Sequence, residues 1–110
     1  MYNKYHAKKT WMKGKVYDSK KEANRAFELE MLAKYGKIKN LQKQVPFVLQ
    51  EGYVNKHGKK VRPITYIADF TYVEDGVLIV EDTKGFETDV FKIKRKMLEY
   101  KYPDIEFRVF

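Results

Sequence analysis

Asp82 and Lys84 are the residues whose types and spacing most clearly suggest chemistry. They lie near the end of the stretch Val77-Leu78-Ile79-Val80-Glu81-Asp82-Thr83-Lys84-Gly85. Its short apolar run follows an Asp75-Gly76 turn, and this pattern predicts a buried strand. Side chains alternate along a strand, so Asp82 and Lys84 project from one side and Glu81 from the other. An ordinary salt bridge at a strand end would look the same and contribute at most ~1 kcal/mol, so the context has to decide.

A second acid, Asp69, lies in the middle of the preceding β segment, which we expect over Val61–Val73 with Pro63 at its start. An acid in a mid-strand position costs desolvation energy unless a metal or a partner compensates it. A tight hairpin centred near Asp75 would place Asp69 almost opposite Asp82. Two carboxylates held close together repel each other unless a cation lies between them.

A third acid, Glu22, belongs to the first predicted helix. Ser19-Lys20-Lys21-Glu22 has capping-box spacing, and the helix should run to about Ala33 and end at Gly36. Helical spacing places Glu22 on the same face as Ala26, Leu29 and Ala33. Glu22 is therefore either a capping acid, which contributes ~1 kcal/mol, or a group that points toward Asp82 and Lys84. The two roles are compatible.

These residue types suit the hydrolysis of a phosphodiester, which needs charge neutralisation, an activated water and stabilisation of the transition state. Mg²⁺ takes oxygen ligands and keeps several waters, so one or two carboxylates suffice. We expect Asp69, Asp82 and the backbone carbonyl of Thr83 to bind Mg²⁺, with Mn²⁺ able to substitute. Lys84 would orient or help deprotonate the water. Glu22 would act as a ligand, directly or through water, or would serve a second metal.

The remaining elements are predicted from turns, caps and periodicity. Thr10–Met12 and Lys15–Tyr17 should form a hairpin, and Gln42–Gln50 should be an edge strand because it contains Pro46. Glu51–Lys60, which holds Gly52, Asn55 and Gly58, should contain a turn or loop. A second helix should run from Val90 to about Tyr102, capped by Thr88 or Asp89, and a last strand should cover Ile105–Phe110. We expect the apolar stripe of that helix to comprise Val90, Phe91, Ile93, Met97, Leu98 and Tyr100, with Lys94 and Lys101 falling inside it.

The fold class that follows is α/β, in a single domain over residues 1–110. The order is helix, three strands, helix, strand, behind a basic N-terminal arm or hairpin at residues 1–17. On the hairpin strands, we expect Ala68, Phe70 and Tyr72 to share one face.

The charge balance points to an anionic partner. The formal net charge is +8 and the isoelectric point about 9.5, so nucleic acid is the first expectation and an anionic membrane surface the second. The chain has no cysteine and no run of ~20 apolar residues, so we expect no thiolate site, no membrane span and a cytoplasmic location. With only His6 and His57, a histidine-based metal site is improbable. The basic residues expected to contact DNA are Lys4, Lys8, Lys9, Lys13, Lys15, Lys92, Arg95 and Lys96.

The chain resembles the PD-(D/E)XK nuclease superfamily, whose core has the order αβββαβ. That superfamily carries an acid in its first helix, an Asp on its second core strand and (D/E)-x-K on its third, and Glu22, Asp69 and Asp82-Thr83-Lys84 occupy these places. Ala68 stands where the Pro of the superfamily's name would be, and Lys94 lies where many members keep a polar residue. Several short sequence segments are similar to those of a family of small phage-encoded proteins. The matching segments are Lys4-Tyr5-His6, Tyr17-Asp18-Ser19-Lys20-Lys21-Glu22-Ala23, Asn40-Leu41-Gln42-Lys43-Gln44-Val45-Pro46-Phe47, Tyr66-Ile67-Ala68-Asp69-Phe70 and Val80-Glu81-Asp82-Thr83-Lys84-Gly85.

The resemblance implies a restriction-endonuclease-like core, in which two helices flank a mixed four-stranded sheet. It also implies a phage-encoded, Mg²⁺-dependent DNA endonuclease, with branched DNA as one candidate substrate, and Glu22, Asp69, Asp82, Lys84 and Lys94 as its site. Cutting both strands symmetrically would call for a homodimer. Two alternatives stay open: a catalytically silent DNA-binding module, and a basic phage assembly protein.

Overall fold

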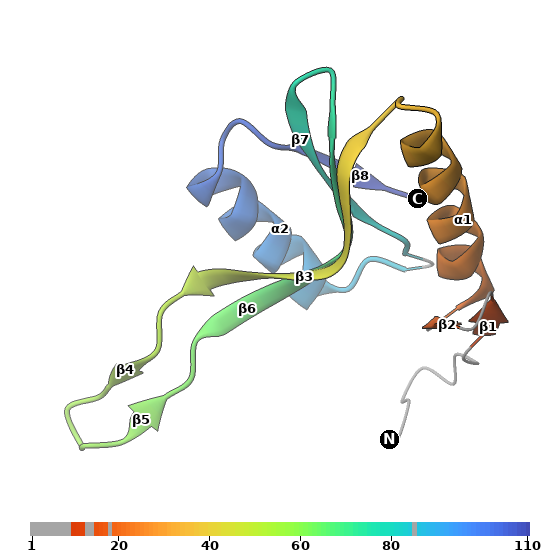
Figure 1. The fold of residues 1–110 in the computed structure, drawn as a ribbon. Coiled ribbons are helices and arrows are strands. Elements are labelled where there is room, and N and C mark those ends of the chain that lie inside the picture. The colour runs from red at the N-terminus through yellow and green to blue at the C-terminus, as the bar shows by residue number, and fades with distance from the viewer. Residues whose placement is uncertain (1–9, 13–14, 18, 85) are drawn as a thin grey trace.

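The computed structural model describes residues 10–12, 15–17, 19–84 and 86–110, which form an α/β fold with two helices and a mixed four-stranded sheet (Figure 1). The sheet order is β3-β6-β7-β8, in which only the β7–β8 pair is parallel. No helix among the described residues is long and apolar enough to cross a membrane. The elements are β1 (Thr10–Met12), β2 (Lys15–Tyr17), α1 (Lys20–Lys34), β3 (Lys39–Gln50), β4 (Tyr53–Val54), β5 (Lys60–Val61), β6 (Ile64–Glu74), β7 (Val77–Asp82), α2 (Asp89–Lys101) and β8 (Glu106–Val109).

Local signals in the sequence set most of the boundaries. The Ser19 hydroxyl accepts a hydrogen bond from the Glu22 amide (3.1 Å), and Gly36 ends the turn after α1 with φ 73°. The Thr88 hydroxyl caps α2 in the same way. Helix ends, the β1–β2 pair and the edge position of β3 are therefore confirmed. Lys13 and Gly14, the expected turn of the first hairpin, lie outside the described residues.

Two strand boundaries differ from the prediction. β3 begins at Lys39, three residues earlier than Gln42, because Ile38 is buried against α1 and ties the connection to the core. The second β segment is interrupted around Pro63, whose missing amide cannot continue the ladder, so it divides into β5 and β6. The Glu51–Lys60 segment contains β4 as well as a turn.

The β6–β7 hairpin aligns the two strands as predicted. Asp75 and Gly76 have φ values of 51° and 79°, so both central residues of the turn have a left-handed backbone conformation. A two-residue hairpin turn of this kind matches the right-handed twist of the two strands it joins. Phe70 then pairs with Glu81, and the same register brings the Asp69 backbone next to Asp82.

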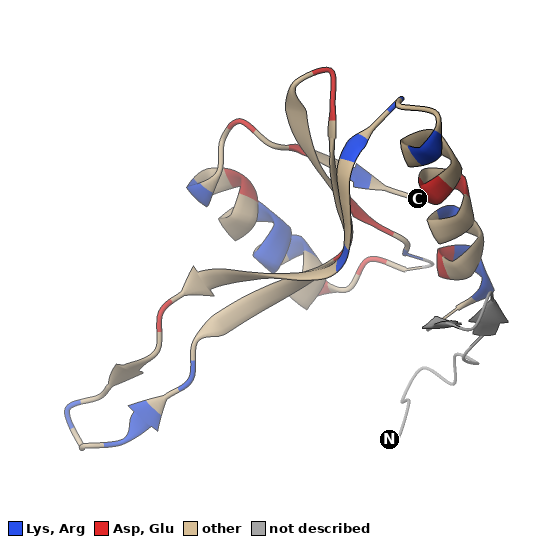
Figure 2. Cartoon of the chain, viewed as in Figure 1, with Lys and Arg blue, Asp and Glu red and all other residues tan. Residues whose placement is uncertain are grey.

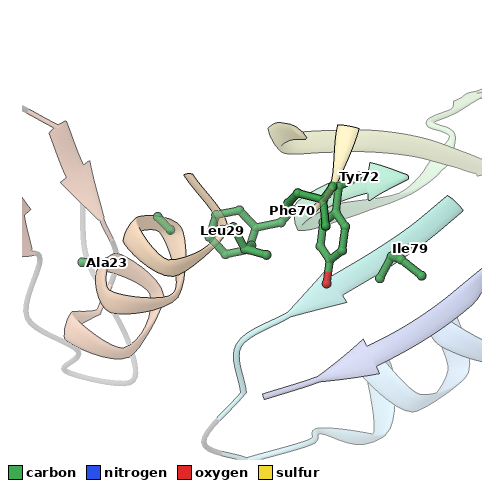
Figure 3. Packing of buried hydrophobic residues seen from close by; sticks show 7 residues of the cluster. Ala23, Leu29, Phe70, Tyr72 and Ile79 are labelled. Carbon is green, nitrogen blue, oxygen red and sulfur yellow. The ribbon is translucent and has the colours of Figure 1, made fainter. Parts of the chain in front are cut away.

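A bend in β3 and β6 divides the core into two clusters. On one face, Phe70 and Tyr72 of β6 and Ile79 of β7 pack with Ala23 and Leu29 of α1 (Figure 3). On the other, Tyr66, Ala68 and Val80 pack with Phe91 and Leu98 of α2 and with Phe107 of β8. The prediction that Ala68 shares a face with Phe70 and Tyr72 is therefore wrong. The change of face coincides with Gln44 on the neighbouring strand, whose φ of 53° breaks the extended conformation.

The packed stripe of α2 is narrower than predicted. Only Phe91 and Leu98 are fully buried, seven residues apart, whereas Val90, Ile93 and Tyr100 are exposed. The expected stripe was thus wrong at those three positions, because α2 covers the end of a small sheet and meets it along a single line of side chains.

A buried ion pair fastens α1 to the sheet on the face opposite Asp82. The Arg25 guanidinium donates two hydrogen bonds to the carboxylate of Glu81 (Nε to Oε2 2.6 Å, Nη2 to Oε1 3.0 Å). The Tyr72 hydroxyl donates a third (2.5 Å), and burial together with this bond raises the pKa of Tyr72 to about 12. Glu81 is wholly buried, and these hydrogen bonds offset the cost of removing its carboxylate from water.

Removing one partner of this pair should destabilise the fold. Arg25→Met should lower the free energy of unfolding by about 3–5 kcal/mol, since Glu81 would stay buried without its cation. The double variant Arg25→Met/Glu81→Gln should recover part of this loss in urea denaturation. Glu99→Gln, which breaks the exposed Arg95–Glu99 pair (3.5 Å), is the control and should change stability by less than about 0.5 kcal/mol. A loss from Arg25→Met no larger than that of the control would contradict a role for the pair.

Candidate functional site

Asp69 and Asp82 meet at the end of the β6–β7 ladder. The Asp69 amide donates to Asp82 Oδ1 (3.1 Å), and Asp69 Oδ2 accepts from both the amide and the hydroxyl of Thr83 (2.9 Å each). The predicted approach of the two acids across the hairpin is confirmed. Each carboxylate accepts a hydrogen bond from a backbone amide of the other segment, so the geometry of the pair depends on the register of the two strands.

The Asp82 carboxyl is in an unusual electrostatic position. It is completely buried, and this burial, together with the neighbouring Asp69 charge, raises its pKa from 3.8 to about 7. The Tyr66 hydroxyl donates to Asp82 Oδ2. Burial, and after it the Asp82 charge, raises the pKa of Tyr66, so this hydroxyl keeps its proton and remains a donor.

Lys84 lies beside the pair as its spacing predicts. Its Nζ is 3.6 Å from Asp82 Oδ2 and 5.0 Å from the centre of the Phe91 ring. The backbone on either side is fixed by two hydrogen bonds to the C-terminal residue, from the Lys84 amide to the Phe110 carbonyl (2.8 Å) and from the Phe110 amide to the Asp82 carbonyl (2.9 Å). β7 therefore keeps a defined direction past its last paired residue, and Lys84 stays on the carboxylate side. Glu81 points to the other face, as predicted.

Glu22 reaches the same region through Gln44. The helix acid is buried, and its Oε2 accepts from the Gln44 side-chain amide (3.2 Å), which also lies 3.5 Å from Asp69 Oδ1. One amide group thus stands between the two carboxylates. Across the described ranges, no group of three or more acidic, histidine or cysteine side chains is gathered closely enough to hold a metal ion. Asp69 and Asp82 are the adjacent pair, and Glu22 joins them indirectly.

The other candidate residues are placed differently. The half-buried Lys94 donates from Nζ to the Thr65 carbonyl (2.8 Å), so its ammonium engages the β6 backbone and not a carboxylate. Arg95 lies over the Phe107 ring (4.6 Å) and against Glu99, whereas Lys92 and Lys96 are exposed on α2. Of the arm residues, Lys4, Lys8, Lys9 and Lys13 lie outside the described part of the chain, and of Lys15 only its place in β2 is described.

Comparison with known proteins gives a family but no activity. A family model described as "Protein of unknown function (DUF1064)" matches residues 2–109. The chain belongs to the DUF1064 family. No curated protein and no solved structure matches it. The carboxylate pair and its neighbours therefore carry the functional argument for this DUF1064 chain.

Two parts of the candidate site could not be predicted from the sequence. Strict alternation places Tyr66 on the face opposite Asp69, yet the bend turns its hydroxyl toward Asp82. Gln44 is one polar residue among several in β3, and its role depends on its positive φ. The signal in each case is a polar residue on the strand next to that of an acid, as Tyr66 is for Asp82 and Gln44 is for Asp69.

The raised pKa of Asp82 predicts how stability depends on pH. Between about pH 4, near the pKa of an unfolded Asp, and pH 7, the folded chain holds a proton that the unfolded chain has lost. The contribution of Asp82 to the free energy of unfolding should therefore fall as pH rises through this window. Asp82→Asn has no such proton, so its stability should decline less from pH 5 to pH 7.5. Parallel urea titrations test this, and identical pH profiles for the two proteins would contradict it.

Proposed function

We propose that this chain is a Mg²⁺-dependent DNA endonuclease with a restriction-endonuclease-like αβββαβ core. The observation that carries the proposal is the convergence of Asp69 and Asp82 beside Lys84. A buried acid, Asp82, with a second acid, the partly exposed Asp69, directly beside it is unfavourable for a purely structural purpose, because each charge raises the cost of the other. A site that receives a cation and a phosphate explains why both acids and the lysine are present.

The donor set fits Mg²⁺. Asp69, Asp82 and the Thr83 carbonyl would hold the ion, with Glu22 acting from the Gln44 side, directly or through water. All of these are oxygen ligands, and two carboxylates plus waters are a normal complement for Mg²⁺. The raised pKa of Asp82 supports this assignment, since a cation would favour its ionised form. Bound Mg²⁺ would neutralise phosphate oxygens and make a coordinated water more acidic.

The protein's own residues would then position the reacting groups. The Lys84 ammonium, 3.6 Å from Asp82, would orient the attacking water and stabilise negative charge that develops on the phosphate. The Tyr66 hydroxyl would hold the Asp82 carboxylate in one orientation. Lys94 would act as a positioning residue, because its hydrogen bond fixes Thr65, which directly precedes Tyr66.

DNA would be held by charge around this centre. Lys92 and Lys96 expose their side chains on α2, and the arm lysines add to the net charge of +8.

We also propose a homodimer, because symmetrical cutting of two strands needs two such sites. Sedimentation equilibrium tests this, and a monomer at all concentrations would refute it.

A cleavage assay tests the proposal directly. Wild type should cut linear duplex, flap or four-way junction DNA with Mg²⁺ or Mn²⁺ and should be inactive in chelator. Asp82→Asn and Lys84→Ala should each lose about 10²-fold or more in rate, since each removes a group that acts on the transition state. Both variants should still bind DNA, measured by fluorescence polarisation.

Asp75→Asn is the matched control, because it makes the same chemical change at the hairpin turn, where Asn tolerates the positive φ. It should cut at the wild-type rate. If wild type cleaves none of these substrates with either metal, the enzyme hypothesis fails. Salt-sensitive binding would then favour a DNA-binding module, and the absence of binding would favour an assembly protein.

A further inference from the structure

The β4–β5 ribbon is a surface that the proposed catalytic centre does not use. Strands β3 and β6 run on past the bend into a narrow two-stranded extension that projects away from both helices (Figure 1). Within the described residues, β4 and β5 pair only with each other. Nearly every residue of 51–63 is exposed, so the extension contributes little to the core.

The end of this ribbon is strongly basic. Figure 2 shows Lys and Arg at the turn between β4 and β5 and along β5. Residues 51–62 carry one acid, Glu51, and four basic side chains, namely Lys56, Lys59, Lys60 and Arg62. Like charges crowded on a two-stranded tip repel one another, and they are tolerated at lower cost when a polyanion is their partner.

The tip is built to hold its shape. The Asn55 side-chain oxygen accepts from the amides of His57 (2.9 Å) and Lys59 (3.0 Å), and the Asn55 amide donates to the Lys59 carbonyl (2.9 Å). Gly58 supplies the left-handed residue of the turn, with φ 79°. At the neck, a Cβ on Gly52 would lie 2.8 Å from the Val61 carbonyl oxygen, so only glycine lets the strands approach there. A preorganised tip loses less entropy on binding than a flexible loop does.

Shape and chemistry favour duplex DNA over other polyanions. The major groove of B-form DNA is about 12 Å wide and admits a two-stranded β ribbon, whereas that of A-form RNA is too narrow for side chains to read. Val54 pairs with Lys60, so an apolar and a basic side chain share one face of the ribbon. Val54 is 62% exposed, and such a residue can contact a thymine methyl group while lysines reach the phosphates.

We propose that the β4–β5 ribbon binds the major groove of B-form DNA on one side of the catalytic centre. Because β6 carries Asp69 and β3 carries Gln44, the ribbon is a direct extension of the strands that form the site. The position of the scissile phosphate relative to the ribbon rests on the proposed nuclease function. The binding itself does not, and it is measured without divalent metal.

The test compares two triple variants with equal loss of charge. Lys56→Gln/Lys59→Gln/Lys60→Gln removes charge from the tip. Lys34→Gln/Lys37→Gln/Lys39→Gln removes it from exposed positions at the α1–β3 connection, away from the ribbon (Figure 2). Fluorescence polarisation is recorded in chelator with a duplex of about three helical turns, between about 50 and 200 mM salt.

The tip variant should reduce the magnitude of the slope of log K against log salt by about 2 to 3, roughly 0.9 for each phosphate that the tip no longer neutralises, and should weaken binding at low salt at least tenfold. The control should change the slope by less than about 1. Lys56→Arg/Lys59→Arg/Lys60→Arg should bind as wild type does, which separates charge from folding. Duplex RNA should show no dependence on the tip.

Equal losses from the two triple variants, or a tip-dependent binding of anionic vesicles instead of DNA, would overturn the inference. So would a wild-type protein that binds no duplex DNA. Cleavage at the wild-type rate by a tip variant with unchanged affinity would overturn it while leaving the nuclease proposal intact. Tip-dependent binding without any cleavage would refute only the nuclease proposal.

Discussion

The close approach of Asp69 and Asp82 is the constraint on which the rest of the structure depends. The Asp82 carboxyl is buried and Asp69 lies beside it, and this burial together with the Asp69 charge raises the pKa of Asp82 to about 7. The chain does not relieve this by separating the strands. It holds the pair in place with the Thr83 amide and hydroxyl on one side and the Tyr66 hydroxyl on the other. Such an arrangement is stable when the acids share a proton or a cation.

Two features of the fold fix the surroundings of the pair. The β3–β6 bend turns Tyr66 and Ala68 toward α2, and the Tyr66 hydroxyl reaches Asp82 from there. On the opposite face, the bidentate contact between Arg25 and Glu81 anchors α1 to β7. Because Glu22 is one helical turn before Arg25, the same anchor determines how close Glu22 and Gln44 come to Asp69.

Local rules predict what depends on neighbours in sequence. The caps at Ser19 and Thr88 and the Asp75-Gly76 turn each follow from the residues themselves, and the turn sets the register that brings Asp69 to Asp82.

The predictions that failed depend on tertiary packing. Alternation could not anticipate a bend, and helical periodicity could not show that α2 would bury only one line of side chains. The predicted turn within Glu51–Lys60 is confirmed, but the sequence does not predict the short strands beside it, because a two-residue strand has too few positions to show a period. Glu81, which alternation directs away from the site, is the centre of a buried network, and no pattern in the sequence reveals its partners.

Direct measurement of metal binding tests the central claim, that Asp69 and Asp82 form a cation site. Isothermal titration of Mg²⁺ or Mn²⁺ into the DNA-free protein near pH 8, above the raised pKa of Asp82, needs neither substrate nor turnover. We predict a saturable binding event that is lost in both Asp69→Asn and Asp82→Asn and retained in Asp75→Asn. Binding of equal strength in Asp82→Asn, or no binding of either metal to wild type, would contradict the claim.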